Sequence, residues 1–180
     1  MKSVIVFQPV FHIYNRSNDR STLFTEDRYY SYFLRKVDRN FADGAHLLGY
    51  CLMPNHFHLL LTPKHPITVE LKLDGKPLPR MPNKYISEAV RCTLMGFTKG
   101  FNNELALTGS RFQQRTKCKY HHGFLGHGLD YVHLNPTEAK LVDHPSEWGY
   151  SSYNEYSGLI DPEDCLCNVQ LGKSLLLRGF

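Results

Sequence analysis

The stretch Gly49–Pro63, GYCLMPNHFHLLLTP, constrains the fold of this chain more than any other. Two apolar runs, Ala45–Met53 and Phe57–Thr62, flank the turn-forming tripeptide Met-Pro-Asn, and this pattern predicts a β-hairpin. Within it His56 and His58 stand two residues apart, so a strand would point both imidazoles to one face. Such a pair suits a divalent metal ion. It also suits two chance neighbours on an exposed face, because the chain has 10 histidines.

Composition places few limits on function. Of the 180 residues, 42% are hydrophobic and 13% aromatic, which predicts one globular domain with a substantial core. Lysine and arginine (21) exceed aspartate and glutamate (17), and the net charge of +4 permits a polyanionic partner without requiring one. The five cysteines lack a Cys-x-x-Cys pair, and no apolar run approaches the ~18 residues of a membrane span. We therefore expect a cytoplasmic protein with reduced thiols and no membrane partner.

The segments around the hairpin predict an α+β fold. Val4–Tyr14 is rich in β-branched and aromatic residues and is expected as a strand. Apolar periodicity predicts helices over Glu26–Phe41 and Asn83–Asn102. Ser110–Tyr120 alternates polar and apolar residues, which predicts a strand with one basic face, and Leu125–Asn135 suits another helix. This order predicts an antiparallel sheet with helices packed on one face and the candidate site on the other.

Two stretches are less regular. Pro63–Pro82 is rich in proline and suits either a small hairpin turning at Asp74-Gly75 or a long surface loop. Residues 158–180 show no clear period and are expected as a C-terminal tail after a domain spanning residues 1–157. Pro136 is expected to disturb the preceding helix just after Asn135.

Tyr131 and Asn135 are the second notable pair. On a helix these positions are one turn apart and share a face. A phenol and an amide projected toward His56 and His58 would combine one nucleophile with three metal ligands, a set suited to phosphoryl transfer. The alternative is a core tyrosine whose hydroxyl is satisfied locally, and these residues alone leave both interpretations open.

Three longer segments carry a family resemblance. FHIYNRSNDR (11–20), GYCLMPNHFHLLL (49–61) and YVHLNPTEAKLV (131–142) resemble the single-tyrosine HUH transposases of bacterial insertion sequences. The resemblance is strongest to their relatives associated with repetitive extragenic palindromes (REPs). It implies an HUH endonuclease fold, of the ferredoxin-like or RRM-like type.

The resemblance also implies roles for single residues. His56, His58 and Asn135 would hold Mg²⁺ or Mn²⁺, and Tyr131 would cut single-stranded DNA near hairpins, leaving a 5′-phosphotyrosine and a free 3′-hydroxyl. The family contains both monomers and dimers, so a homodimer is compatible with it. From their charge alone, we expect phosphate contacts from Arg16, Arg20, Arg111, Arg115, Lys117 and Lys119.

The chain departs from the family pattern at identifiable positions. GFLGHGLD precedes the tyrosine where an aliphatic helix is usual, and Glu138 stands where a basic residue is common. One alternative function is therefore a domesticated protein that binds hairpin DNA without cutting it, although all four site residues are intact. A hydrolase of the histidine-triad type would need a third histidine at Leu60, and the chain lacks it.

Overall fold

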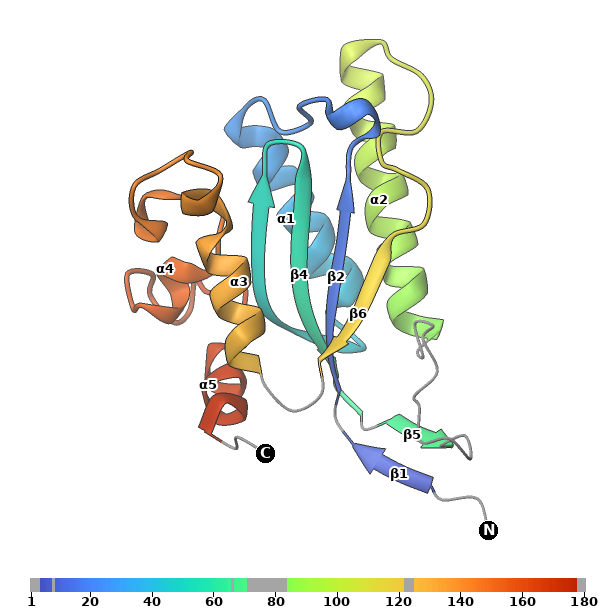
Figure 1. The fold of residues 1–180 in the computed structure, drawn as a ribbon. Coiled ribbons are helices and arrows are strands. Elements are labelled where there is room, and N and C mark those ends of the chain that lie inside the picture. The colour runs from blue at the N-terminus through green and yellow to red at the C-terminus, as the bar shows by residue number, and fades with distance from the viewer. Residues whose placement is uncertain (1–3, 8, 66, 71–83, 122–124, 178–180) are drawn as a thin grey trace.

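The centre of the structure is a four-stranded antiparallel sheet with the strand order β3-β4-β2-β6 (Figure 1). The computed structural model describes residues 4–7, 9–65, 67–70, 84–121 and 125–177. A separate antiparallel pair joins β1 to β5. The strands are β1 (Val4–Phe7), β2 (Val10–Arg16), β3 (Ala45–Met53), β4 (His56–Pro63), β5 (Ile67–Glu70) and β6 (Lys117–His121).

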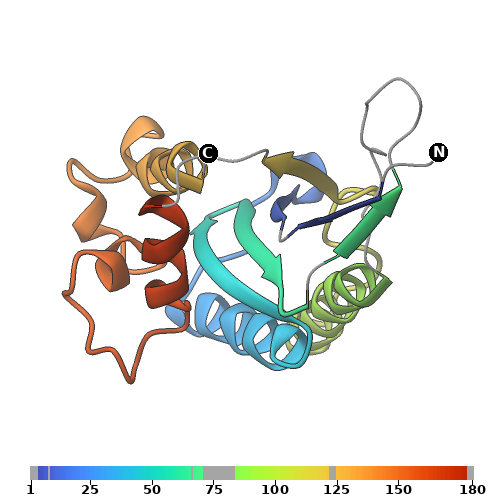
Figure 2. The same cartoon turned by 90° about the horizontal axis from the view of Figure 1, so that it is seen from below.

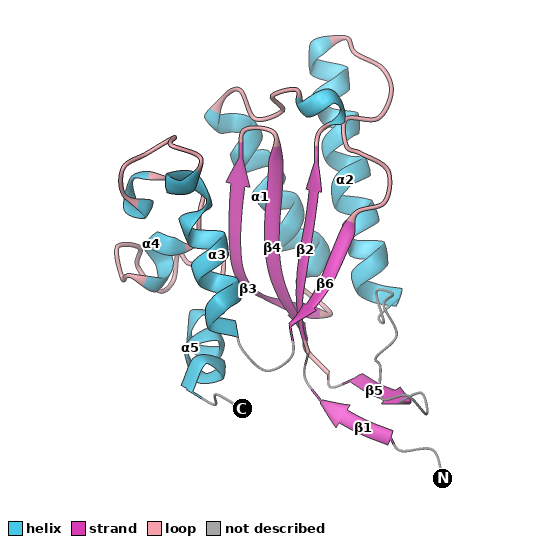
Figure 3. Ribbon diagram, in the orientation of Figure 1, coloured by secondary structure: helices cyan, strands magenta, loops and turns pink. Residues whose placement is uncertain are grey.

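The helices complete an α+β architecture, which confirms the predicted fold class (Figure 3). Among the described residues no helix is long and apolar enough to cross a membrane. All five cysteines are free thiols. The α-helices are α1 (Asp27–Phe41), α2 (Lys84–Leu105), α3 (Leu125–Glu138), α4 (Tyr153–Tyr156) and α5 (Val169–Leu177), and 3₁₀ turns span η1 (Asn18–Arg20) and η2 (Pro145–Glu147).

Helices α1 and α2 lie side by side against one face of the sheet (Figure 2). Their contact is aromatic: Phe33 of α1 and Phe97 of α2 are completely buried, with ring centroids 5.4 Å apart. Phe57 of β4 lies 5.0 Å from Phe33. The four-residue period of aromatic and β-branched side chains in α1 produces this packing, because it places them on one helical face.

Helix α3 packs against the opposite face, over β3 and β4. Leu48 and Leu60 of the sheet form a second apolar cluster with Leu129 and Val132 of α3. The β3–β4 register shifts between Leu47 and Gly49, and this bulge turns two successive residues of β3 toward α3. A Cβ at Gly49 would lie 2.7 Å from Leu129 Cδ2, so the missing side chain lets α3 approach the β3 backbone closely.

The outer edge of β3 is covered by the C-terminal part of the chain. Leu52 N donates to the Tyr150 carbonyl at 2.9 Å, and Trp148 Nε1 donates to the Leu52 carbonyl at 3.0 Å. Asn168 N donates to the Leu47 carbonyl at 2.8 Å. These bonds satisfy edge groups that would otherwise be open for pairing. They also bring α5, an element that the sequence does not predict, against α3 and β3.

Three predicted boundaries need correction. The single strand expected over Val4–Tyr14 is two strands in different sheets, β1 and β2, with Pro9 between them. Proline has no backbone N–H for a sheet ladder, which accounts for an interruption there. The strand expected over Ser110–Tyr120 is confined to β6, and the preceding residues form a loop in which Phe112 makes an isolated bridge to Ser17, the residue after β2.

Helix α3 continues past the expected end, with Pro136 inside it. Proline removes one hydrogen bond of the helical ladder, but the next donors are used: Ala139 N donates to the Asn135 carbonyl at 3.0 Å, and Leu141 N to the Pro136 carbonyl at 2.9 Å. Pro136 is buried, so packing outweighs the lost bond. The turn expected at Asp74-Gly75 and the expected cap Asn83 lie outside the described residues.

Candidate metal and nucleophile site

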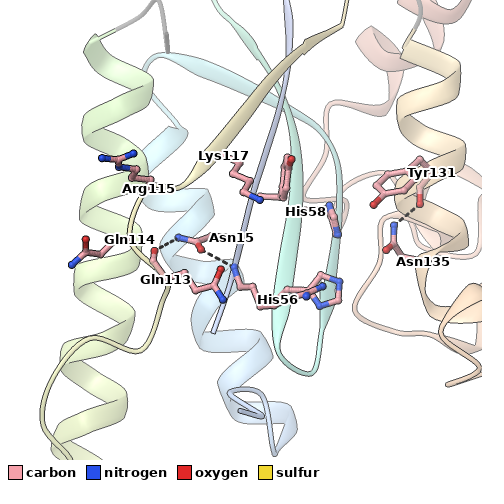
Figure 4. A pocket seen from close by; sticks show the side chains of 11 residues that line it. Asn15, His56, His58, Gln113, Gln114, Arg115, Lys117, Tyr131 and Asn135 are labelled. Carbon is pink, nitrogen blue, oxygen red and sulfur yellow. Dashed lines mark hydrogen bonds between the residues drawn. The ribbon is translucent and has the colours of Figure 1, made fainter. Parts of the chain in front are cut away.

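Antiparallel pairing of β2 with β4 brings the predicted histidines beside residues far away in sequence. His58 lies opposite Tyr14, and His56 lies opposite Arg16, so these four side chains share the sheet face that α3 covers. A pocket of about 280 Å³ opens there between β2, β4, α3 and the loop before β6 (Figure 4). It is lined by Tyr14, Asn15, Arg16, His56, His58, Gln113, Gln114, Arg115, Lys117, Tyr131 and Asn135.

The two histidines are held in their neutral forms. Their ring centroids are 5.1 Å apart, and both rings are largely shielded from water. Burial lowers the pKa of His56 to about 4, with a smaller contribution from Arg16. Burial, followed by the proximity of His12, lowers the pKa of His58 to about 2. Neutral imidazole is the form that ligates a metal, so the site is ready to do so at neutral pH.

Tyr131 projects from α3 toward the histidines. Its ring centroid is 5.5 Å from that of His58 and 5.7 Å from that of His12, in edge-on geometry at both. Its side chain is 48% exposed, although it sits on a helix whose other face is buried. A tyrosine that packs against two imidazoles and is open to solvent can reach an incoming substrate.

Asn135 lies one turn beyond Tyr131 and lines the same pocket (Figure 4). Its Nδ2 donates to the Tyr131 carbonyl at 2.5 Å, so Oδ1 is the atom of this amide that could serve as a metal donor. Among the described residues no group of three or more His, Cys, Asp or Glu side chains could hold a metal. The pocket therefore offers two imidazole nitrogens and the Asn135 amide oxygen as candidate donors for a divalent metal ion.

The structure divides the six basic residues that charge had singled out. Arg16, Arg115 and Lys117 line the pocket. Lys119 lies next to it, with Nζ 5.7 Å from the centroid of the Tyr14 ring. Arg20 and Arg111 are not among the lining residues, and the Arg111 guanidinium donates to the Thr108 carbonyl.

Arg115 has a left-handed backbone conformation, with φ of 65°. Residues other than glycine adopt this region at an energetic cost, and such conformations concentrate at functional loops. The neighbouring amides Gln113 and Gln114 line the pocket as well. Sequence reasoning missed these two glutamines, because a loop has no period that would indicate where its side chains point.

Sequence reasoning also missed Tyr14 and His12 on β2. Their positions alternate with Arg16, so a shared face could have been inferred from the strand period alone. The strand period does not give the register of β2 against β4. This register places Tyr14 beside His58, with ring centroids 5.7 Å apart.

One comparison identifies the architecture. A solved structure of a REP-associated tyrosine transposase bound to a REP hairpin matches this one with a TM-score of 0.61, at 20% sequence identity. The match covers 94% of this chain and 91% of that one. The fold is that of a REP-associated tyrosine transposase. At this identity the likeness establishes the fold, and within the transposase fold the pocket described above combines His56, His58, Tyr131 and Asn135. No protein-family model and no curated protein sequence matches the chain.

Proposed function

We propose that the protein is a metal-dependent endonuclease and transposase that cuts single-stranded DNA beside hairpins, with Tyr131 as its nucleophile. One observation carries the proposal: His56 and His58 on β4 and Tyr131 and Asn135 on α3 line one pocket. The transposase of the same fold, which is bound to a REP hairpin, supports hairpin DNA as the substrate class.

His56, His58 and Asn135 would hold Mg²⁺ or Mn²⁺, which, when bound, supplies a positive charge that polarises a scissile phosphate. The Tyr131 hydroxyl oxygen attacks the phosphorus and loses its proton. The bond from phosphorus to the 3′ oxygen breaks and that oxygen takes up a proton, which leaves a 5′-phosphotyrosine and a free 3′-hydroxyl. A 3′-hydroxyl attacking that phosphotyrosine reverses the step, releases the tyrosine and rejoins the strands.

The cationic rim of the pocket suits this chemistry. The attacking phenol must lose its proton, and positive charge nearby stabilises the negative charge that develops on the reacting oxygens. Arg16, Arg115 and Lys117 supply that charge and can also neutralise phosphates on either side of the cut. Tyr14 offers a flat ring at the pocket wall on which an unpaired base can stack.

The test uses Tyr131→Phe, which removes one oxygen and little volume. A single strand carrying a REP-like hairpin is incubated with Mn²⁺, and a covalent adduct is sought by denaturing electrophoresis and mapped by mass spectrometry. We expect the wild-type adduct on Tyr131, and loss of both adduct and cleavage in Tyr131→Phe with hairpin binding retained. Tyr153→Phe, at a tyrosine outside the pocket lining, is the matched control. Wild-type protein that binds the hairpin but forms no adduct would favour the binding-only alternative.

A further inference from the structure

Asn55, the residue before the first histidine, contacts the His56 ring in a way that sets its protonation. Asn55 Oδ1 lies 2.7 Å from His56 Nδ1. The orientation of the amide is defined by its other end, because Asn55 Nδ2 donates to the Arg20 carbonyl at 3.2 Å. A carboxamide oxygen only accepts hydrogen bonds, so His56 Nδ1 must carry the proton. A neutral imidazole has one such proton, and the lone pair is therefore on Nε2.

His12 stands in the corresponding position beside His58. It is buried, with 4% of its surface exposed, and its Nε2 lies 2.8 Å from His58 Nδ1. The two rings are stacked, with centroids 5.0 Å apart and planes inclined by 29°. His12 comes from β2, so this contact depends on the same strand pairing that forms the pocket. Here one nitrogen must donate and the other accept.

We propose that Asn55 and His12 are positioning residues that hold both candidate ligands in the Nδ1–H tautomer, with a lone pair on Nε2 of each. In this arrangement His58 Nδ1–H donates a hydrogen bond to His12 Nε2, just as His56 Nδ1–H donates one to Asn55 Oδ1. Metal-ligating histidines usually donate their second ring nitrogen to such a partner, which fixes both tautomer and orientation. The proposal rests on the proposed function for the metal, whereas the tautomers are a property of the metal-free protein.

The loop after β2 holds the Asn55 side of this arrangement. Ser17 N donates to the Asn55 carbonyl at 2.8 Å, and Leu23 N and Phe24 N donate to the Pro54 carbonyl at 2.8 and 3.0 Å. Arg20, whose carbonyl receives the Asn55 amide, has a left-handed φ of 55°. Three backbone bonds and a strained residue thus fix the turn between β3 and β4, and a fixed turn gives His56 a fixed partner.

The test reads the tautomers directly in the metal-free protein, by long-range ¹H–¹⁵N correlation NMR of the histidine rings. We expect both His56 and His58 as Nδ1–H. An Nε2–H tautomer at either wild-type histidine would overturn the proposal for that residue, whatever the protein does to DNA. Absence of DNA cleavage with both tautomers as expected would instead overturn the proposed function alone.

Variants add a second measurement, the binding of Mn²⁺ alone, followed by the electron paramagnetic resonance signal of the free ion. Asn55→Leu should release the His56 tautomer and weaken Mn²⁺ binding about 10- to 100-fold. Asn55→Asp keeps an accepting oxygen and should retain both, whereas a purely space-filling role would be kept by Asn55→Leu as well, because the three side chains have similar volumes. His12→Leu and His12→Gln form the equivalent pair for His58. Asn103→Leu, at an exposed position of α2, is the control and should change neither. Unchanged Mn²⁺ affinity in folded Asn55→Leu and His12→Leu would refute the positioning role.

Discussion

The two faces of the central sheet use the same strands for different purposes. On β4, Phe57 and Leu59 point into the aromatic core under α1 and α2, whereas His56 and His58 point into the pocket beside α3. The first face is sealed by large apolar side chains along its length. The second face, the open face, is apolar on β4 at Leu60, which packs in the cluster under α3, and polar at His58 and His56. Strand alternation therefore assigns neighbouring residues of one strand to the core or to the pocket, so stability and chemistry can be changed by separate substitutions.

The largest effect on stability should come from the sealed face. Phe33 is completely buried, and its ring packs 5.0–6.2 Å from those of Phe24, Phe57, Phe97 and Phe112. Phe33→Ala leaves a cavity and should lower the free energy of unfolding by about 3–5 kcal/mol. Urea titration followed by circular dichroism measures this. Tyr131→Phe on the open face should cost less than about 0.5 kcal/mol, because the side chain is half exposed. Similar losses of unfolding free energy for the two variants would show that the two faces contribute equally to stability, contrary to this prediction.

A smaller effect is expected where α3 meets β3. In Gly49→Ala the new Cβ would lie 2.7 Å from Leu129 Cδ2 and 3.3 Å from Leu60 Cδ1, so buried side chains must shift. We expect a loss of about 1–3 kcal/mol in unfolding free energy, as for other overpacked sites. DNA cleavage should fall as well, because Tyr131 moves with α3.

Gly149 provides the matched control for this prediction. A Cβ at this position meets no atom within 4 Å, so Gly149→Ala should leave stability and cleavage nearly unchanged. If Gly49→Ala changes stability and cleavage as little as Gly149→Ala does, then α3 does not pack closely against the β3 backbone at Gly49.

The parts of the site that could be predicted from sequence are those set by local periods. The two-residue spacing of His56 and His58 and the four-residue spacing of Tyr131 and Asn135 each place two side chains on one face, whatever the rest of the chain does. Helices α1 and α2 were predictable for the same reason. Their apolar periods run over several turns, and the structure changes only their boundaries.

The remainder depends on contacts between distant segments. The place of His12 beside His58 follows from the β2–β4 register, for which neither strand carries a marker. The contact of Asn55 depends on the loop that supplies the Arg20 carbonyl. Helix α5 has no clear apolar period, because it buries only a short patch against α3 and β3. The helix end predicted before Pro136 was wrong for a related reason. Burial of Pro136 in the folded protein outweighs the local tendency of proline to end a helix.

Acid should lower the free energy of unfolding through three buried histidines, two of which line the pocket. Burial is the main cause that lowers the pKa of His56 and His133 to about 4 and that of His58 to about 2, from an ordinary value near 6.5. Below pH 6.5 the unfolded chain therefore binds protons that the folded chain does not. The stability present above pH 6.5 should be lost as pH falls toward 4, by at most about 1.4 kcal/mol per pH unit for each histidine.

Urea titrations between pH 7.5 and 5 measure how the free energy of unfolding changes with pH. The variant His133→Gln separates the contribution of His133 from that of the pocket histidines. His133 Nε2 lies 2.8 Å from Ser152 Oγ, away from the pocket lining, so this variant should flatten the slope without affecting Mn²⁺ binding. Added Mn²⁺ should raise the free energy of unfolding of both proteins by an amount that changes little over this pH range, because ligation requires neutral His56 and His58 and both are already neutral in the folded protein. Stability that is constant over this range in both proteins would contradict neutral histidines on this face.

The smallest effect concerns the charged rim of the pocket. Lys117 is exposed and lines the pocket, whereas Lys173 is exposed on α5, outside the lining. If Lys117 contacts one phosphate of a bound strand, Lys117→Ala should weaken hairpin binding a few-fold at low salt, independently of the sequence of the hairpin. The slope of log affinity against log salt should also fall by about 0.7, the contribution of one neutralised phosphate on a single strand. Lys173→Ala should change neither quantity. Fluorescence anisotropy of a labelled hairpin over a salt series measures both, and equal slopes for the two variants would place the DNA path elsewhere on the molecule.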